Sequence, residues 1–337
     1  MSAPDCMGKQ RDAKRPSSRL LAALLALLLT MTGFSQFTPT ACKRVESAGQ
    51  PDGNGRIKVI TTVFATYDFT RQIAGSHVEV KMLIPPGMEP HSYEPTPQDI
   101  LDIAQCNLFI YIGGESDSWI LDLLSSIDTS DMEILRLMDC VVLLQEDDTV
   151  LIDSGAWINR ESETDEHIWT SISNARLITW AIAARLMALD PENSDAIDAA
   201  TREYILQLDE LDVLIQGIVT DAKRATLIFG DRFPFTYFAA DYGLECRAAF
   251  PGCSSATEAS ARTVALLIDN VRQEGIPAVF YIELSNHRIA TTIANETGTQ
   301  ALLMNSCHNI SAQDFTNGET YLSLMRKNAE NLKVALN

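Results

Sequence analysis

The sequence predicts an α/β fold of two lobes, each built on a parallel sheet, with one long helix joining them. In two separate blocks of the chain, strand-like apolar runs alternate with helical patterns, which is the order that parallel sheets produce. Between the blocks, residues 194–222 suit one uninterrupted helix, because they carry an apolar stripe at helical spacing: Ile205, Leu206, Leu208, Leu211, Leu214, Ile215 and Ile218. The length of 337 residues also fits two domains better than a single core.

The first block begins with a β-rich run at residue 57. We expect a strand entering a helix (57–75), a strand (78–86), a helix (96–106), a buried strand stopped by glycines (107–114), a helix (118–127) and a further strand (133–139). Thr96 is placed to cap its helix ahead of Asp99. Residues 145–166 are acidic and irregular and are expected to form a loop, after which helical spacing returns at Ser173.

The second block repeats the alternation after the long helix. We expect a strand (225–231), a helix ended by Gly243 (234–244), a strand and turn (246–252), a helix (260–275), a strand (276–284), a helix (287–298), a strand (300–306) and a terminal helix (318–336). Two α/β lobes therefore flank the central helix.

The N-terminus has the pattern of an export signal, assigned to residues 1–41. A basic segment precedes an apolar run of roughly 15 residues, which is short for a bilayer span of about 20. Cys42 follows Thr40 and Ala41, small residues of the kind that a lipoprotein signal peptidase accepts, and a polar tether continues to residue 56. Ordinary cleavage nearby, or an uncleaved anchor, is the alternative. The mature protein is expected outside the cytoplasm, where disulfides persist.

Charge and cysteine content narrow the function further. The net charge of -19 disfavours nucleic acid, because phosphate binding needs clustered Lys and Arg. Apart from Cys6 and Cys42, five cysteines remain, and an odd number leaves at least one unpaired within the chain: Cys106, Cys140, Cys246, Cys253 and Cys307.

Three of the five histidines, His91, His167 and His308, lie where strands should end. Ligands of open α/β sheets bind beyond the carboxyl ends of the strands, so these imidazoles could converge on one metal ion such as Zn²⁺. A lone histidine there is usually only a hydrogen-bonding residue, but the loop around His91 is stiffened by five prolines. Asp231 and Glu283 are strand-end carboxylates that could join them.

Other chemistry finds little support in the sequence. It has no compact HExxH, no paired CxxC, no GxSxG, no P-loop and no GxGxxG. His77 and His287 lack a comparable context and are expected at the surface.

Four segments together resemble the solute-binding proteins of zinc and manganese ABC transporters. They are PHSYEPTPQDI, DEHIW, the long central helix and the C-terminal ETYLSLMRKNAENLKVAL, and the resemblance covers residues 57–337. It implies a metal held in the cleft between two lobes bridged by a rigid helix. On this basis the N-terminal lobe spans 57–190, the linking helix 191–223 and the C-terminal lobe 224–337.

The resemblance also implies a set of metal ligands. His91 and His167 match the first two family ligands. Arg232 falls at the third position and cannot bind a cation, so Asp231 is the expected replacement. The fourth position falls on Asn305, a poor zinc ligand, and His308 is expected to act instead. The predicted ligands are therefore His91, His167, Asp231 and His308, with Glu283 and Asn305 as alternatives.

The implied function is capture of zinc, with manganese as the alternative, and delivery to an ABC permease in the membrane. The protein would be a monomer without enzymatic activity, lipid-anchored through Cys42 or periplasmic, with affinity falling below about pH 6.5 as histidine protonates. Disulfides between Cys253 and Cys307, and between Cys106 and Cys140, are candidates. The rival functions are a metal-dependent hydrolase, with Glu283 or Asp231 as general base, and a surface adhesin.

Overall fold

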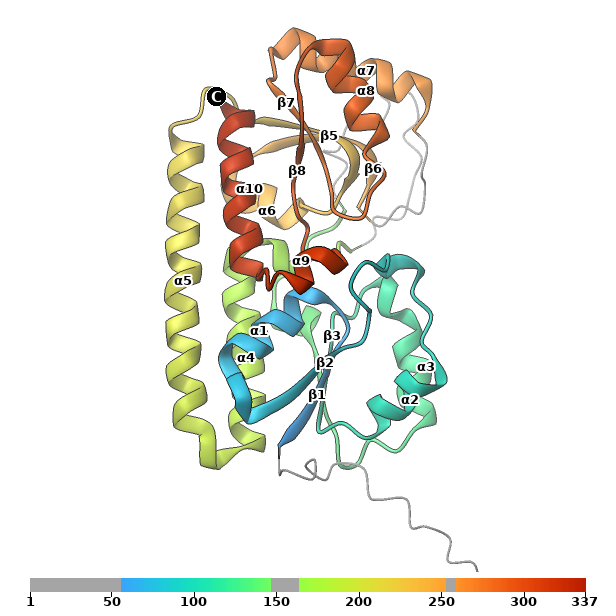
Figure 1. Ribbon diagram of the computed structural model, residues 1–337, viewed down its shortest axis with the longest axis vertical. Helices are drawn as coiled ribbons and strands as arrows, with labels where there is room; N and C mark the ends of the chain where they lie inside the picture. Colours follow the sequence, from blue (N-terminus) through green and yellow to red (C-terminus); the bar gives the residue numbers. More distant parts are fainter. Residues whose placement is uncertain (1–55, 147–163, 253–258) are drawn as a thin grey trace, which may run out of the picture. The chain divides into compact units, whose positions relative to one another are not determined.

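Two four-stranded parallel sheets form the centre of the computed structural model, which describes residues 56–146, 164–252 and 259–337 (Figure 1). The first sheet has the order β2-β1-β3-β4, from β1 (Ile57–Thr61), β2 (Val78–Met82), β3 (Leu108–Tyr111) and β4 (Glu133–Arg136). The second has the order β6-β5-β7-β8, from β5 (Thr226–Phe233), β6 (Glu245–Pro251), β7 (Ala278–Tyr281) and β8 (Gln300–Leu303). The predicted α/β fold is confirmed.

Helices cover both faces of the first sheet. They are α1 (Phe64–Ala74) on one face, and α2 (Pro97–Ala104) and α3 (Ser118–Ser126) on the other (Figure 1). Thr96 caps α2 as expected, because its hydroxyl accepts from the Asp99 N–H while the Asp99 carboxylate accepts from the Thr96 N–H. This local bonding fixes where the loop carrying His91 ends.

The second sheet is covered in the same way by α6 (Thr236–Tyr242), α7 (Ala261–Glu274) and α8 (Arg288–Thr297). Gly243 ends α6 in the left-handed region at φ 64°, as the sequence predicts. Gly230 in β5 lets α8 approach closely, because a Cβ there would lie 2.4 Å from the Ala290 Cα. The register of β5 against β6 shifts between Phe229 and Arg232.

Two long helices connect the lobes, α5 (Ser194–Thr220) and α10 (Tyr321–Leu336), and a third long helix, α4 (Ile172–Leu189), packs beside α5. Figure 1 shows α5 running beside both sheets, and it packs against α4, α10 and α1. Leu208, Leu211 and Ile215 are buried along α5, whereas Leu206 and Leu214, also counted in the predicted apolar stripe, are exposed. One hydrophobic core continues from the first lobe into the second through these helices.

After β8 the chain returns to the first lobe. The Phe64 N–H donates to the His308 carbonyl at 3.0 Å, and the Gly87 N–H donates to the Ile310 carbonyl at 2.8 Å. The Asn309 side-chain amide donates to the carbonyls of Pro85 and Met88. The sequence analysis missed the short helix that follows, α9 (Ala312–Thr316). These bonds bring His308 to the first lobe.

The candidate disulfide between Cys106 and Cys140 is wrong. Both residues have free thiols, as do Cys246 and Cys307. Cys106 lies in the core on the α2 and α3 side of the first sheet, beside Met132, whereas Cys140 packs against the core on the opposite side. The sheet between them prevents a bond that needs Cα atoms within about 7 Å. Cys253, Cys42, the export signal and most of the acidic loop lie outside the described residues.

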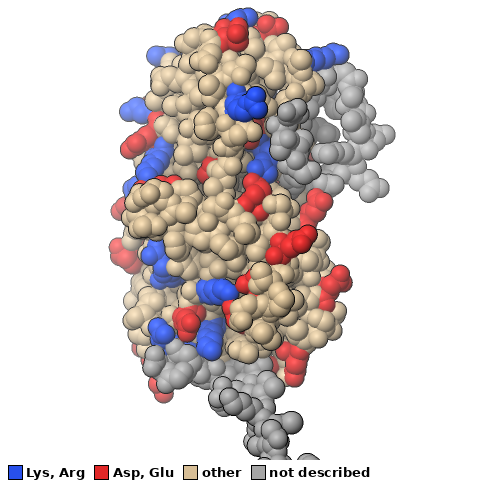
Figure 2. All heavy atoms as spheres, turned by 45° about the vertical axis from the view of Figure 1, so that its right-hand side comes forward, with Lys and Arg blue, Asp and Glu red and all other residues tan. Residues whose placement is uncertain are grey.

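Within the described ranges, no helix has both the length and the apolar character needed to cross a bilayer. Acidic and basic side chains are interspersed over much of the face drawn in Figure 2, whereas the right-hand edge of its lower half carries acidic side chains without basic ones. On this face, the negative net charge of the sequence does not form a single acidic patch.

Candidate metal-binding site

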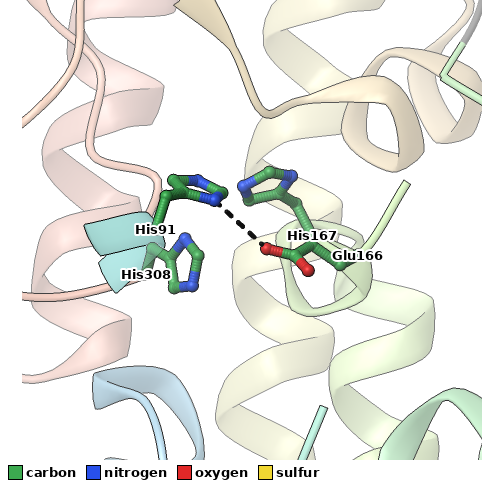
Figure 3. A group of neighbouring side chains, drawn as sticks. All are labelled: His91, Glu166, His167 and His308. Carbon is green, nitrogen blue, oxygen red and sulfur yellow. Dashed lines mark ion pairs between the residues drawn. The ribbon is translucent and has the colours of Figure 1, made fainter. Parts of the chain in front are cut away.

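Four side chains from separate parts of the chain meet between the lobes: His91, Glu166, His167 and His308 (Figure 3). Each offers one ligand atom, and these atoms all lie within 4.8 Å of one another. The ring centroids are 5.7 Å apart for His91 and His167, 5.0 Å for His91 and His308, and 5.1 Å for His167 and His308. Three loops that follow different strands therefore supply one compact cluster.

His91 is held by the rigid loop after β2. It lies in a single 3-10 turn, Pro90–Ser92, and its Nδ1 is 2.7 Å from the Ser116 hydroxyl, which donates to Glu166. This contact leaves Nε2 for a ligand. Burial, followed by the charge of His167, lowers the pKa of His91 to about 4, although Glu166 and Glu89 oppose this shift. His91 is thus neutral at neutral pH, as a metal ligand must be.

His167 is oriented by its neighbour Asp165. The Asp165 Oδ1 accepts from the His167 backbone N–H and lies 2.8 Å from the ring Nδ1, which leaves Nε2 for a metal. Metal-binding histidines commonly have such a carboxylate partner. Burial alone would lower the pKa of His167, but the charge and hydrogen bond of Asp165 outweigh it and raise the pKa. His167 is the imidazole of the cluster that most readily holds a proton.

His308 follows a backbone turn in which Cys307 adopts a left-handed conformation at φ 57°. Its ring packs 4.9 Å from that of Trp169, whose Nε1–H donates to the Ser306 carbonyl at 2.7 Å. Burial, and then the charges of His91, His167 and Arg232, lower the pKa of His308 well below 6.5. The Trp169 bond fixes the loop that presents this imidazole.

Glu166 is the cluster residue that the sequence analysis did not predict. Both of its oxygens accept from Ser116, one from the hydroxyl and one from the backbone N–H at 3.0 Å. Gly114 makes room for it, because a Cβ there would lie 2.2 Å from Oε2 and 2.3 Å from the Glu166 Cβ. The only sequence signal was its position directly before His167, and the direction of its side chain depends on the distant Gly114.

The other candidates lie around the cluster. Asp231, a predicted ligand, is not among the four clustered residues, and its carboxylate accepts from the backbone N–H groups of Arg232 at 2.9 Å and Ile282 at 3.4 Å. Glu283 accepts from the backbone and hydroxyl of Ser306, and its burial raises its pKa. The Asn305 side chain lies 3.3 Å from Asn328. The structure thus brings together three of the four predicted ligands.

The cavity beside these side chains is ion-sized, with a volume of ≈ 20 Å³, which suits about one water molecule or one metal ion. His91, His167 and His308 line it together with Glu89, Arg232 and Glu283, among others.

The donor chemistry fits a transition metal. Three imidazole nitrogens and one carboxylate oxygen are ligands that tetrahedral zinc accepts. Bonds of about 2.0–2.2 Å place tetrahedral donors roughly 3.4 Å apart. The observed limit of 4.8 Å therefore requires the most distant donors to approach one another by about 1.4 Å.

Two α/β lobes around an ion-sized cavity define the class of two-lobed solute-binding proteins. The family model described as zinc-uptake complex component A, periplasmic (ZnuA), matches residues 59–335. The chain therefore belongs to this family.

Relatives of known name agree with this assignment. The chain is 29% identical over 318 residues to the zinc-binding lipoprotein AdcA of Streptococcus pneumoniae (R6), covering 94% of this chain and 60% of AdcA. It is 28% identical over 298 residues to the high-affinity zinc uptake system protein ZnuA of Bacillus subtilis (168), covering 88% of this chain and 93% of the relative. The chain thus spans about 60% of the length of AdcA.

Solved structures show the same fold. The metal-dependent lipoprotein YcdH of Bacillus subtilis superposes with a TM-score of 0.70 at 27% identity, covering 84% of this chain and 100% of that chain. The Zn(II)-bound ZnuA-like domain of Streptococcus pneumoniae AdcA gives a TM-score of 0.69 at 27% identity, covering 84% and 99%.

Proposed function

We propose that this protein captures one divalent transition metal between its lobes, zinc in preference to manganese, and delivers it to an ABC permease. The observation that carries the proposal is the meeting of His91, His167 and His308 with Glu166 within 4.8 Å. Two of these imidazoles are kept neutral by their surroundings, and the third is oriented by Asp165. Such a site binds a cation without first losing several protons.

The donor types favour zinc over manganese. Imidazole is a borderline ligand that suits zinc, whereas manganese prefers carboxylate, carbonyl and water oxygens. Three of the four clustered groups are imidazoles. The relatives point the same way, because AdcA and the Bacillus subtilis ZnuA are both named for zinc.

Delivery to a permease and the location outside the cytoplasm rest on the family and the N-terminus. The family description names a periplasmic component of zinc uptake, and AdcA and YcdH are called lipoproteins. The signal-like residues 1–41 and Cys42 fit export followed by lipid attachment. Such a protein carries its ion to the transporter, and it catalyses no reaction in which covalent bonds form or break.

The geometry favours capture over hydrolysis. The cavity volume of ≈ 20 Å³ suits about one water molecule or one ion. A four-donor shell leaves no coordination position for a catalytic water. The two carboxylates considered as general bases, Glu283 and Asp231, are already held by Ser306 and by backbone N–H groups.

Calorimetry on chelator-stripped protein tests the proposal. We expect one zinc per chain with nanomolar or tighter affinity, and loss of this binding in the double variant His91→Ala/His167→Ala. His287→Asn is the matched control, because His287 is exposed and outside the cluster, and Asn tolerates its left-handed backbone at φ 44°. Unchanged tight binding by the double variant would refute the site, and wild-type protein that binds no zinc would refute the function.

A further inference from the structure

An ion pair crosses between the lobes in the wall of the cavity. Arg232, in β5 of the second lobe, donates from both terminal nitrogens to the two carboxylate oxygens of Glu89, at 3.1 and 2.8 Å. Glu89 lies in the first lobe, two residues before His91. The side chain of Arg232 is 14% exposed and that of Glu89 is 33% exposed, so the pair is partly shielded from water. Both residues line the cavity together with the three histidines.

Arg232 brings a permanent positive charge to a cavity that receives a cation. A guanidinium stays protonated at every physiological pH and cannot bind a metal. Its charge reaches the cluster, because it contributes to lowering the pKa values of His91 and His308. Glu89, Asp231 and Glu283 all lie close enough to stabilise this charge. Arg232 is therefore paired with Glu89 and lies within electrostatic reach of Asp231 and Glu283.

Glu89 is the carboxylate most completely engaged by this arginine. Both of its oxygens face the guanidinium in fork-to-fork geometry, and the carboxylate also accepts a hydrogen bond from the His91 backbone, so its lone pairs are engaged away from the cavity's ion. Without Arg232, its carboxylate would remain in the cavity wall, beside His91, with no cation to hold it. An additional oxygen donor of this kind would favour harder metals such as manganese.

We propose that Arg232 determines the metal selectivity of the site: by holding Glu89, it withholds an oxygen donor and presents the ion with a histidine-rich set. The inference rests on the proposed metal capture and concerns the choice of ion. It makes Arg232 a positioning residue that acts through Glu89 and does not contact the metal.

Zinc and manganese affinities, measured by chelator competition on stripped protein, test the inference in four chains: wild type, Arg232→Gln, Glu89→Gln and the double variant. For Arg232→Gln we expect manganese to bind roughly tenfold tighter or more, because a positive charge is removed and a carboxylate released, while zinc changes less. In the double variant the released carboxylate is absent, so the zinc-to-manganese ratio should return toward the wild-type value. The electron paramagnetic resonance spectrum of bound Mn²⁺ should change in Arg232→Gln and revert in the double variant.

The matched control is Asp198→Asn, which breaks an exposed bidentate pair with Arg202 on α5 and should leave both affinities unchanged. Thermal melting of the metal-free chains verifies folding. The inference would be overturned by an unchanged ratio of zinc to manganese affinity in Arg232→Gln, or by a gain in manganese affinity that persists in the double variant. Either result would leave the proposed function intact. Wild-type protein that binds neither metal would overturn the proposed function as well.

Discussion

Oδ1 of Asp165 lies 2.8 Å from Nδ1 of His167, and both side chains are almost completely buried. A buried carboxylate is costly unless it is paired, and this imidazole is its charge partner. The pair also determines the tautomer of His167, because a proton on Nδ1 leaves the Nε2 lone pair for a cation. Asp165 thus prepares a ligand without being one of the clustered donors.

Replacement of Asp165 by Asn should weaken zinc binding about 10- to 100-fold, the usual effect of losing the partner of a metal-binding histidine. Asn keeps the shape of the side chain but removes the charge that raises the pKa of His167. Chelator competition at pH 7 measures the change. Asp190→Asn, in the turn before α5, is a control expected to bind zinc normally. Wild-type affinity in Asp165→Asn would contradict the role of the pair.

Zinc affinity should fall as the pH is lowered, beginning above pH 6.5, with a slope that corresponds to about one proton displaced by each bound ion. His167 has a raised pKa and must release its proton to bind, whereas His91, with a pKa of about 4, and His308, also lowered, are already neutral. Three adjacent imidazoles do not all charge at once, because each positive ring opposes the next. Dissociation constants between pH 5 and 8 measure the slope. A slope of two or three protons across that range would show that the rings titrate independently.

Gly114→Ala should lower zinc affinity at least about tenfold, because the new methyl group would occupy the space of the Glu166 carboxylate. The backbone of Gly114, at φ −84°, is accessible to alanine, so the effect is one of space. Gly217→Ala is the matched control. It lies in α5 with nothing within 4 Å of the added Cβ and should raise the free energy of unfolding by about 1 kcal/mol without changing affinity. Equal zinc affinity in both variants would show that Glu166 is not a metal ligand.

Trp169→Phe should destabilise the protein by about 1–3 kcal/mol, because the Ser306 carbonyl loses its buried donor. The loop that carries His308 then loses a fixed contact. Tryptophan fluorescence provides a second measurement, since the Trp169 ring packs against His308 and should respond to zinc. Urea unfolding and zinc titration of the variant would show both losses. If the fluorescence response to zinc is undiminished in Trp169→Phe, another tryptophan is responsible for it.

Much of the local structure could be predicted from short-range chemistry. The Thr96 cap, the Gly243 stop of α6 and the alternation of strands with helices each depend on a few neighbouring residues. The apolar stripe predicted the long helix, but not that Leu206 and Leu214 would stay in water. Which side of a helix is covered depends on the helices packed against it, and these come from distant parts of the chain.

The contacts between side chains at the site were harder to predict from the sequence. Strand-end positions pointed to His91, His167 and His308, because parallel strands end at one edge of a sheet. Nothing local predicted that Glu166 would turn toward Ser116, 50 residues away. The pairing of Arg232 with Glu89 spans 143 residues and joins different lobes.

The amino-acid sequence alone determined the kinds of element, their order and the residues able to bind a metal, because these follow from side-chain chemistry and short-range periodicity. The tertiary structure decided which carboxylate stands beside the imidazoles, which one an arginine holds and which cysteines lie on opposite sides of a sheet. Those outcomes depend on distances between residues far apart in the chain, and such distances exist only once both lobes have packed against their shared helices.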